Sequence, residues 1–205
     1  MPPQVLTVST GRVRPLPWRG RAIETAIDKQ PTCETVEVGH LGLAGDEQGD
    51  RKHHGGPDKA VLGYPAEHYS AWAEILGAVE PPAFGENLTT TGLLESDTVV
   101  GSVLLIGSVV LQVSQPRRPC YRLAAFHNHP ELAVLTQQTG RTGIYFRVLQ
   151  PGRLRAGDGI RLLSQPDHGI TVADMLGRRL AGALENQNNR LYGEELGRAW
   201  PQGPV

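Results

Sequence analysis

A single cysteine, Cys120, lies in a segment with prolines and arginines on both sides, SQPRRPCYR at residues 114–122. A thiolate is a good nucleophile and a soft metal ligand, and neighbouring cations favour the thiolate over the thiol. Pro119 fixes its own φ and biases Arg118 towards extended geometry, so the loop should hold the sulfur in one direction. A packed cysteine in a surface loop is the alternative interpretation. The segment by itself leaves both open.

A second concentration of unusual residues is the stretch GDEQGDRKHHGGPDKAV at residues 45–61. Glycines let backbone N–H groups approach an anion closely, and Arg51, Lys52 and Lys59 supply positive charge. A solvated loop is again the alternative, because most charge-rich runs are exposed. The stretch therefore indicates either an anion site or a surface loop.

Motifs for other chemistries are absent or weak. Neighbouring side chains of an extended segment point in opposite directions, so His53 and His54 cannot easily chelate one ion. His127 and His129 fit turn and helix-cap duties beside Pro130. The sequence has no HExxH, CxxC, Walker, dinucleotide-binding or Gly-x-Ser-x-Gly motif. A zinc site is the remaining metal alternative, and any redox chemistry would need another cofactor and electrons from another protein.

Composition limits the fold and the partners. A chain of 205 residues suits one domain with a substantial core, and its 25 glycines and 16 prolines favour a β-rich fold. A net charge of -1 argues against a nucleic-acid polymer or an acidic membrane as partner. Two cysteines make no disulfide framework, and no signal peptide or membrane span is visible, so we expect a cytoplasmic protein.

The elements that must position these residues are mostly strands. Apolar and β-branched runs predict strands at residues 5–10, 22–27, 34–38, 59–64, 84–90, 103–106, 109–113, 144–149 and 160–163. A tight hairpin is expected at the Ile106-Gly107-Ser108-Val109 junction. Residues 11–21 are expected to form a basic, proline-rich loop. Helices are expected from Pro65 to Gly77 and from Pro130 to Gly140.

An amphipathic helix is predicted from Thr171 to Glu185, where Thr171 and Asp174 form a capping box. It either closes a homodimer or packs on its own domain. The absence of regular βαβ alternation favours a mainly β, barrel-like fold with a few short helices. We assign residues 1–165 to a β-barrel domain and residues 166–205 to a short helical extension and tail.

Five motifs together resemble the MOSC family, and more closely its bacterial YiiM-like branch. They are Gly45-Asp46-x-Gln48, HGGPDKA at 54–60, Tyr64-Pro65, FGENL at 84–88 and QPRxPC at 115–120. The match runs in register from about Gly11 to Leu163. The family is related to the C-terminal domain of molybdenum cofactor sulfurase and to the mitochondrial amidoxime-reducing component.

The resemblance implies a MOSC-type β-barrel that carries a molybdenum–molybdopterin cofactor, with Cys120 as the thiolate ligand of the metal. It also carries an association with pyridoxal phosphate binding. The YiiM-like branch is associated with detoxification of N-hydroxylated base analogues, such as 6-hydroxylaminopurine, by reduction. The implied partners are a small N-hydroxylated substrate and an external electron-donating reductase.

The chemistry of such a cofactor agrees with the residues. A cysteinate suits a soft metal, and the anionic pterin phosphate requires local cations in a chain of nearly neutral net charge. His54 or Glu86 would be the general acid of the reaction. The cations available in the matching segments are Arg21, Arg51, Lys52, Lys59, Arg117 and Arg118.

Two further functions remain open at this point. The chain would be a carrier for the pterin cofactor or for sulfur if Cys120 held a persulfide or passed the cofactor on without substrate turnover. It would be a phosphate-binding or interaction domain if the fold persisted without a metal.

Overall fold

The computed structural model describes residues 2–49 and 55–184, with side chains as far as residue 178. Strands dominate, and all helices are short except the last. The strands are β1 (Gln4–Thr10), β2 (Arg14–Trp18), β3 (Arg21–Thr25), β4 (Gln30–Thr32), β5 (Val36–Gly39), β6 (Gly42–Leu43), β7 (Val61–Pro65), β8 (Leu88–Thr91), β9 (Val103–Ile106), β10 (Val109–Pro116), β11 (Ile144–Gln150), β12 (Gly152–Leu154) and β13 (Ile160–Ser164). The helices are the 3-10 turns η1 (Pro57–Lys59) and η2 (Ala66–His68), and α2 (Tyr69–Leu76), α3 (Tyr121–Phe126), α4 (Leu132–Gln138) and α5 (Val172–Leu184).

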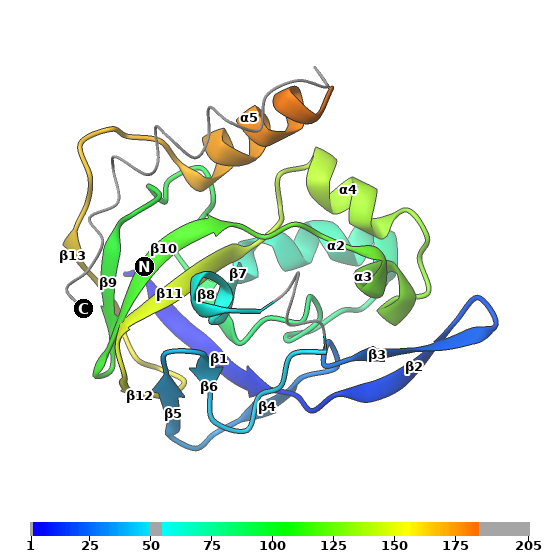
Figure 1. Ribbon diagram of the computed structural model, residues 1–205, viewed down its shortest axis with the longest axis horizontal. Helices are drawn as coiled ribbons and strands as arrows, with labels where there is room; N and C mark the ends of the chain where they lie inside the picture. The colour runs from blue at the N-terminus through cyan, green and yellow to red at the C-terminus, as the bar shows by residue number, and fades with distance from the viewer. Residues whose placement is uncertain (1, 50–54, 185–205) are drawn as a thin grey trace.

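Eight of the strands form one curled sheet in the order β13-β9-β10-β11-β7-β8-β1-β4 (Figure 1). All neighbours are antiparallel except β7 and β8, which are parallel because α2 carries the chain back between them. The predicted tight hairpin is confirmed, since Ile106 pairs with Val109 across Gly107 and Ser108. The mainly β fold class is therefore confirmed.

The barrel detail of the prediction is not confirmed. In the described part of the chain, β13 and β4 end the sheet and do not pair with each other. The turn before β13 meets β1 only at one end, where Val5 N donates to Asp158 O at 2.9 Å and Gln4 forms an isolated bridge with Gly159. The sheet is thus curled and touches itself at one corner without closing.

Residues 11–21 differ from the expected loop. The segment contains β2, which pairs with β3 in a separate two-stranded sheet that projects from the molecule (Figure 1). Pro15 and Pro17 are tolerated because an edge strand has one side without sheet partners. The strand prediction at 84–90 was too long, because β8 begins only at Leu88.

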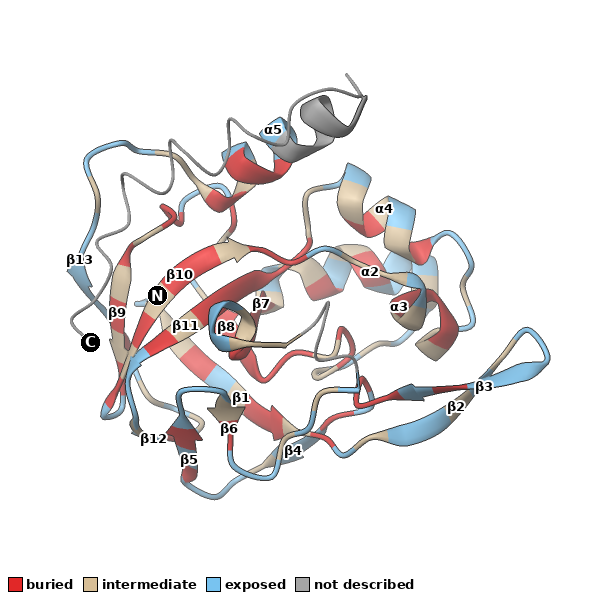
Figure 2. Ribbon diagram, in the orientation of Figure 1, coloured by how far each residue is buried: buried red, intermediate tan, exposed pale blue. Residues whose placement is uncertain are grey.

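The core has two parts. The larger one fills the inside of the curled sheet with apolar side chains from nearly every strand and from the first turns of α5 (Figure 2). The smaller one is an aromatic cluster between β7 and the helices α2, α3 and α4, centred on Tyr64, Tyr69, Trp72 and Phe84. This second cluster forms the floor on which α3 rests.

The capping box of the C-terminal helix is confirmed. Asp174 N donates to Thr171 Oγ1 at 3.1 Å, and Thr171 N donates to Asp174 Oδ2 at 3.0 Å. Val172, Met175 and Leu176 are buried, so the start of α5 packs on its own sheet. Among the described helices, none has the length and apolar character needed to cross a membrane.

Candidate active site around Cys120

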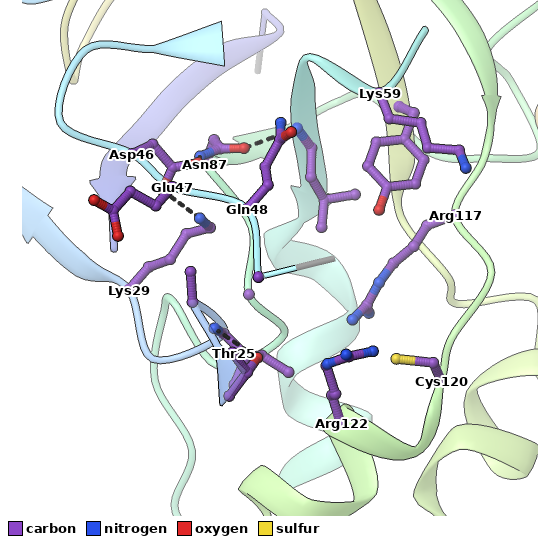
Figure 3. Close-up of a pocket in the computed structure, with 16 residues that line it drawn as sticks. Thr25, Lys29, Asp46, Glu47, Gln48, Lys59, Asn87, Arg117, Cys120 and Arg122 are labelled. Atoms are coloured by element: carbon purple, nitrogen blue, oxygen red, sulfur yellow. Dashed lines mark hydrogen bonds and ion pairs between the residues drawn. The ribbon is translucent and has the colours of Figure 1, made fainter. Parts of the chain in front are cut away.

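A pocket opens beside Cys120, between the end of β10, the segment after β3 and the loop that follows β6 (Figure 3). We call it the Cys120 pocket. Its lining combines one thiol, four cationic side chains and two acidic ones. The lining residues are Thr25, Ala26, Ile27, Lys29, Asp46, Glu47, Gln48, Gly49, Lys59, Leu62, Gly85, Asn87, Arg117, Cys120, Arg122 and Tyr145.

Cys120 is held at the junction of a strand and a helix. β10 ends at Pro116, and Cys120 is the extended residue that precedes α3, with φ −129° and ψ 173°. Its carbonyl accepts the backbone N–H of Leu123 at 3.0 Å, which starts the helix. The thiol is half-buried, and it forms no disulfide with the exposed Cys33. The predicted loop therefore presents the sulfur to the pocket in one direction.

Arg117 places a buried positive charge next to this sulfur. Its side chain is 5% exposed, and its backbone N–H donates to Gly143 O at 3.0 Å. The buried Nη1 atom has no hydrogen-bond partner among the residues that the structure describes. A buried charge without a partner is strongly unfavourable. Arg117 therefore favours binding of an anion in this pocket.

Two further cations face the same space. Figure 3 shows the guanidinium groups of Arg117 and Arg122 pointing towards the Cys120 sulfur, with Lys59 above them. Arg122 Nε donates to Glu24 O at 3.4 Å, and its guanidinium lies 5.1 Å from the Tyr121 ring centre. These contacts hold Arg122 against the pocket wall. The charge composition of this end of the pocket suits a ligand with several anionic oxygens.

The opposite wall is fixed by a buried polar network. Lys29 and Asp46 form an ion pair, and each side chain is 7% exposed. Asp46 also accepts Gly11 N at 2.8 Å and Asn87 Nδ2 at 2.8 Å, while Asn87 Oδ1 accepts Leu62 N at 3.1 Å. The network joins five segments that are far apart in sequence. It gives the pocket a rigid wall before any ligand is present.

Tyr145, on β11, is a further residue of the pocket lining. Burial, the largest influence, raises the pKa of Tyr145 above its usual value, while Arg117 lowers it and Cys120 raises it further. The hydroxyl therefore keeps its proton across the neutral pH range. In this protonated state, the hydroxyl can donate a hydrogen bond.

Comparison with known proteins identifies the family to which this chain belongs. The family model for the MOSC domain matches residues 50–161, more than half of the chain. The chain belongs to the MOSC family. The protein YflK of Bacillus subtilis, itself uncharacterized, is 46% identical over 82% of this chain and 76% of its own length. A Gibberella moniliformis protein named reductase is 36% identical over 80% of this chain, which corresponds to 30% of that protein.

Solved structures place this MOSC protein in the YiiM-like branch. The crystal structure of YiiM from Geobacillus stearothermophilus superposes with a TM-score of 0.75 at 34% identity, covering 91% of this chain and 87% of that one. The chain therefore shares its overall fold with that structure, together with about a third of the aligned residues.

The structure brings together only some of the residues predicted for the site of this MOSC protein. Cys120, Lys59 and Arg117 line one pocket. Arg118 is exposed and does not line it, and Arg21 lies on the projecting hairpin in a separate hollow beside Trp18. Arg51, Lys52 and His54 lie outside the described residues, as does the histidine pair considered for zinc. Among described residues, no three histidine, cysteine or carboxylate side chains are grouped to hold a metal ion.

Glu86, predicted as an acid in the site, lies away from the pocket lining. It is fully buried, and its carboxylate accepts Tyr69 Oη–H, Phe84 N at 2.9 Å and Thr89 Oγ1 at 3.2 Å. Burial raises the pKa of Glu86, although the bonds to Tyr69 and Phe84 lower it. Its neighbour Gly85 does line the pocket, with φ +73°, and a Cβ there would lie 2.9 Å from Ile27 Cγ1.

Sequence reasoning did not single out Lys29, Arg122 or Tyr145 as site residues. Arg122 was visible, two residues after Cys120, in the same basic segment. Lys29 and Tyr145 carry no local signal, because only the folding of β3, β4 and β11 brings them to the pocket.

Proposed function

We propose that this MOSC protein binds the molybdenum cofactor through Cys120 and reduces N-hydroxylated compounds to the corresponding amines or amidines. The observation that carries the proposal is the buried Nη1 of Arg117, which has no partner among the described residues and lies beside the Cys120 thiol in a pocket that also holds Lys59 and Arg122. MOSC domains are associated with this cofactor, and one relative is named a reductase.

The residues present fit such a group. A thiolate is the protein ligand that suits a soft metal site, and Cys120 is the sulfur in the described lining of the pocket. Arg117, Arg122 and Lys59 supply charge-assisted hydrogen bonds for anionic oxygens of the pterin phosphate. Cys120 would thus hold the metal, while the three cations would hold the phosphate-bearing part.

When bound, the cofactor supplies two electrons to the substrate. The N–O bond of the hydroxylamine breaks, two protons are taken up, and the products are an N–H group and water. An external electron-donating reductase restores the two electrons. The protein must therefore bind the substrate at the pocket, exclude competing water and deliver a proton to the leaving oxygen.

Tyr145 supports the proton delivery better than Glu86. A general acid must reach the leaving group directly or through one water molecule. Tyr145 lines the pocket and holds its proton at neutral pH, whereas the Glu86 carboxylate is enclosed by its three donors. We therefore assign proton donation to the Tyr145 hydroxyl in this proposal.

The test compares Cys120→Ala with Cys33→Ala, a matched change at the exposed cysteine, in protein purified from a host that makes the cofactor. We expect near-stoichiometric molybdenum and turnover of 6-hydroxylaminopurine in the wild type and in Cys33→Ala, and loss of both in Cys120→Ala. Equal metal in all three proteins would refute the role of Cys120. Metal that depends on Cys120 without reduction of substrate by a chemically reduced sample would indicate a cofactor or sulfur carrier instead.

A further inference from the structure

The projecting β2–β3 hairpin concentrates positive charge in a chain whose net charge is close to zero. Residues 11–21 contain four arginines and no acidic residue, while the whole chain has a net charge of -1. Arg14, Arg19 and Arg21 are exposed, and Arg12 is 72% exposed beside Glu47 at 3.7 Å. Such a local concentration of charge steers oppositely charged partners towards one place.

Two of the four arginines lie on one face of the hairpin, near its two ends. Residues directly opposite each other share a face in an antiparallel pair. Arg14 pairs with Thr25 and Trp18 pairs with Arg21, and the partly buried Leu16 and the buried Ile23 lie between these pairs on the same face. Glu24, the acidic residue of the hairpin strands, pairs with Pro15 and belongs to the other face. Arg19, at the turn, lies 5.1 Å from the Trp18 ring centre.

The Arg14 end of this face adjoins the Cys120 pocket. Thr25, at the end of β3, lines the pocket, and Arg14 lies directly across the hairpin from it. Arg122, which also lines the pocket, bonds the carbonyl of Glu24 in β3. A protein that contacts Arg14 would therefore lie beside the lining of the pocket.

The tip of the hairpin adds a recognition element. Trp18, Arg19 and Arg21 form a shallow hollow together with Asn128 and Pro130 from the α3–α4 connection. Tryptophan and arginine are the residues most often found at the energetic centres of protein interfaces. The hollow suits the edge of a protein surface better than a small ligand, because it is open and shallow.

We propose that the β2–β3 hairpin is the docking surface for an acidic electron-carrier protein, which delivers electrons to the Cys120 pocket. The proposal rests on the proposed reductase function, since that reaction consumes two electrons per turnover. Charge complementarity and continuity with the pocket wall favour this partner over a nucleic acid, which would have no reason to lie at the pocket mouth.

The experiment uses the full-length, cofactor-loaded protein, with an acidic flavodoxin as the carrier probe and cytochrome c as a basic one. Arg14→Glu and Arg19→Glu each reverse one charge on the hairpin. Arg161→Glu is the matched control, because Arg161 is equally exposed on β13, away from the hairpin. Binding is measured by titration at low and at high salt, and turnover is driven either by reduced flavodoxin or by dithionite.

We expect each hairpin variant to weaken flavodoxin binding about fivefold at low salt, and the double variant about 25-fold. Flavodoxin-driven turnover should fall in parallel, while dithionite-driven turnover and the Arg161→Glu control stay within about twofold of the wild type. High salt should remove most of the difference, and cytochrome c should not bind.

Equal effects of Arg14→Glu and Arg161→Glu, or wild-type flavodoxin binding by the double variant, would overturn the docking surface. The docking surface would also be overturned if the hairpin variants lost binding to a single-stranded oligonucleotide but kept their binding to flavodoxin. An absence of dithionite-driven turnover in the wild type would overturn the proposed reductase function alone. Arginine-dependent flavodoxin binding in that same sample would still support the docking surface.

Discussion

Buried charge is handled in opposite ways in the aromatic cluster around Glu86 and in the Cys120 pocket. The Glu86 carboxylate has three donors within the protein, and the neighbouring Tyr69 hydroxyl accepts Ala83 N at 2.9 Å. In the pocket, Arg117 is almost as deeply buried, yet its Nη1 has no partner among described residues. The first arrangement stabilises the fold, whereas the second leaves a buried cation at the wall of a pocket.

Each of the two regions contains one of the motifs that resemble the family. FGENL belongs to the aromatic cluster and QPRxPC to the Cys120 pocket, and their chemistry differs. In FGENL, Glu86 organises the chain between α2 and β8. The next residue, Asn87, hydrogen-bonds Asp46 in the pocket wall. Ionisable residues of a conspicuous motif can therefore serve structure, and only the hydrogen-bond count distinguishes them from ligand-binding residues.

The largest expected effect concerns Glu86, whose buried carboxylate has three donors within the protein. Glu86→Ala leaves the buried Tyr69 hydroxyl and Phe84 N–H without their acceptor, so we expect the free energy of unfolding to fall by about 3 kcal/mol. Urea denaturation of the apoprotein measures it. A loss below about 1 kcal/mol would show that the cluster does not depend on Glu86.

Substitution of Arg117 should have the opposite effect on the stability of the apoprotein. Arg117→Met removes a buried charge and keeps much of the side-chain volume, so the apoprotein should be as stable as the wild type or more stable. Cofactor affinity should fall about 100-fold, or about 2.7 kcal/mol. Denaturation of the apoprotein and molybdenum content after dialysis give the two values. Strong destabilisation of the apoprotein would mean that Arg117 is a structural residue.

Tyr145→Phe tests the proton donor within the pocket. Removal of the hydroxyl should lower kcat about tenfold, or about 1.4 kcal/mol, with molybdenum content unchanged. Because burial raises the pKa of Tyr145, the deficit should be constant between about pH 6 and 9. Tyr121→Phe, at an exposed tyrosine beside Cys120, is the control. An equal deficit in both variants would remove Tyr145 from the mechanism.

The smallest effect is a pH dependence. Burial raises the pKa of Glu86 in the folded state, so its contribution to stability is fully present below the usual carboxyl pKa and is lost as pH rises through the raised value. Glu86→Gln does not titrate. The stability of the Gln variant relative to wild type should therefore increase as pH rises from about 4 towards neutrality. Parallel curves in urea denaturation across this range would contradict it.

Local signals in the sequence were sufficient for much of the fold. The Thr171–Asp174 capping box and the two-residue turn after Ile106 are found where the sequence predicts them, because both depend on residues within one turn. Long-range pairing was harder. β2 was not predicted because it contains two prolines, which are tolerated only at the edge of a sheet. α3 was not predicted because it is too short to show helical periodicity.

The same difference between local and long-range signals applies to the residues of the site. Cys120 and Arg117 share one local segment, and Lys59 lies in the glycine-rich motif, so sequence reasoning found all three. Tyr145 and Lys29 reach the pocket only through the sheet and through the bond to Asp46. Glu86 was assigned to catalysis because sequence does not reveal that Tyr69 and Phe84 enclose it.

The dispersed origin of the pocket also determines when it can exist during the life of the chain. Its walls come from the first quarter of the sequence, from β7, from the loop before β8, from the end of β10 and from β11. Contacts of such large sequence separation form late, because closing long loops costs entropy before the contacts are gained. A chain still emerging from the ribosome has no Tyr145 wall and no Gly143 carbonyl to hold Arg117. Any ligand that needs all of these walls must therefore be loaded after translation has passed β11.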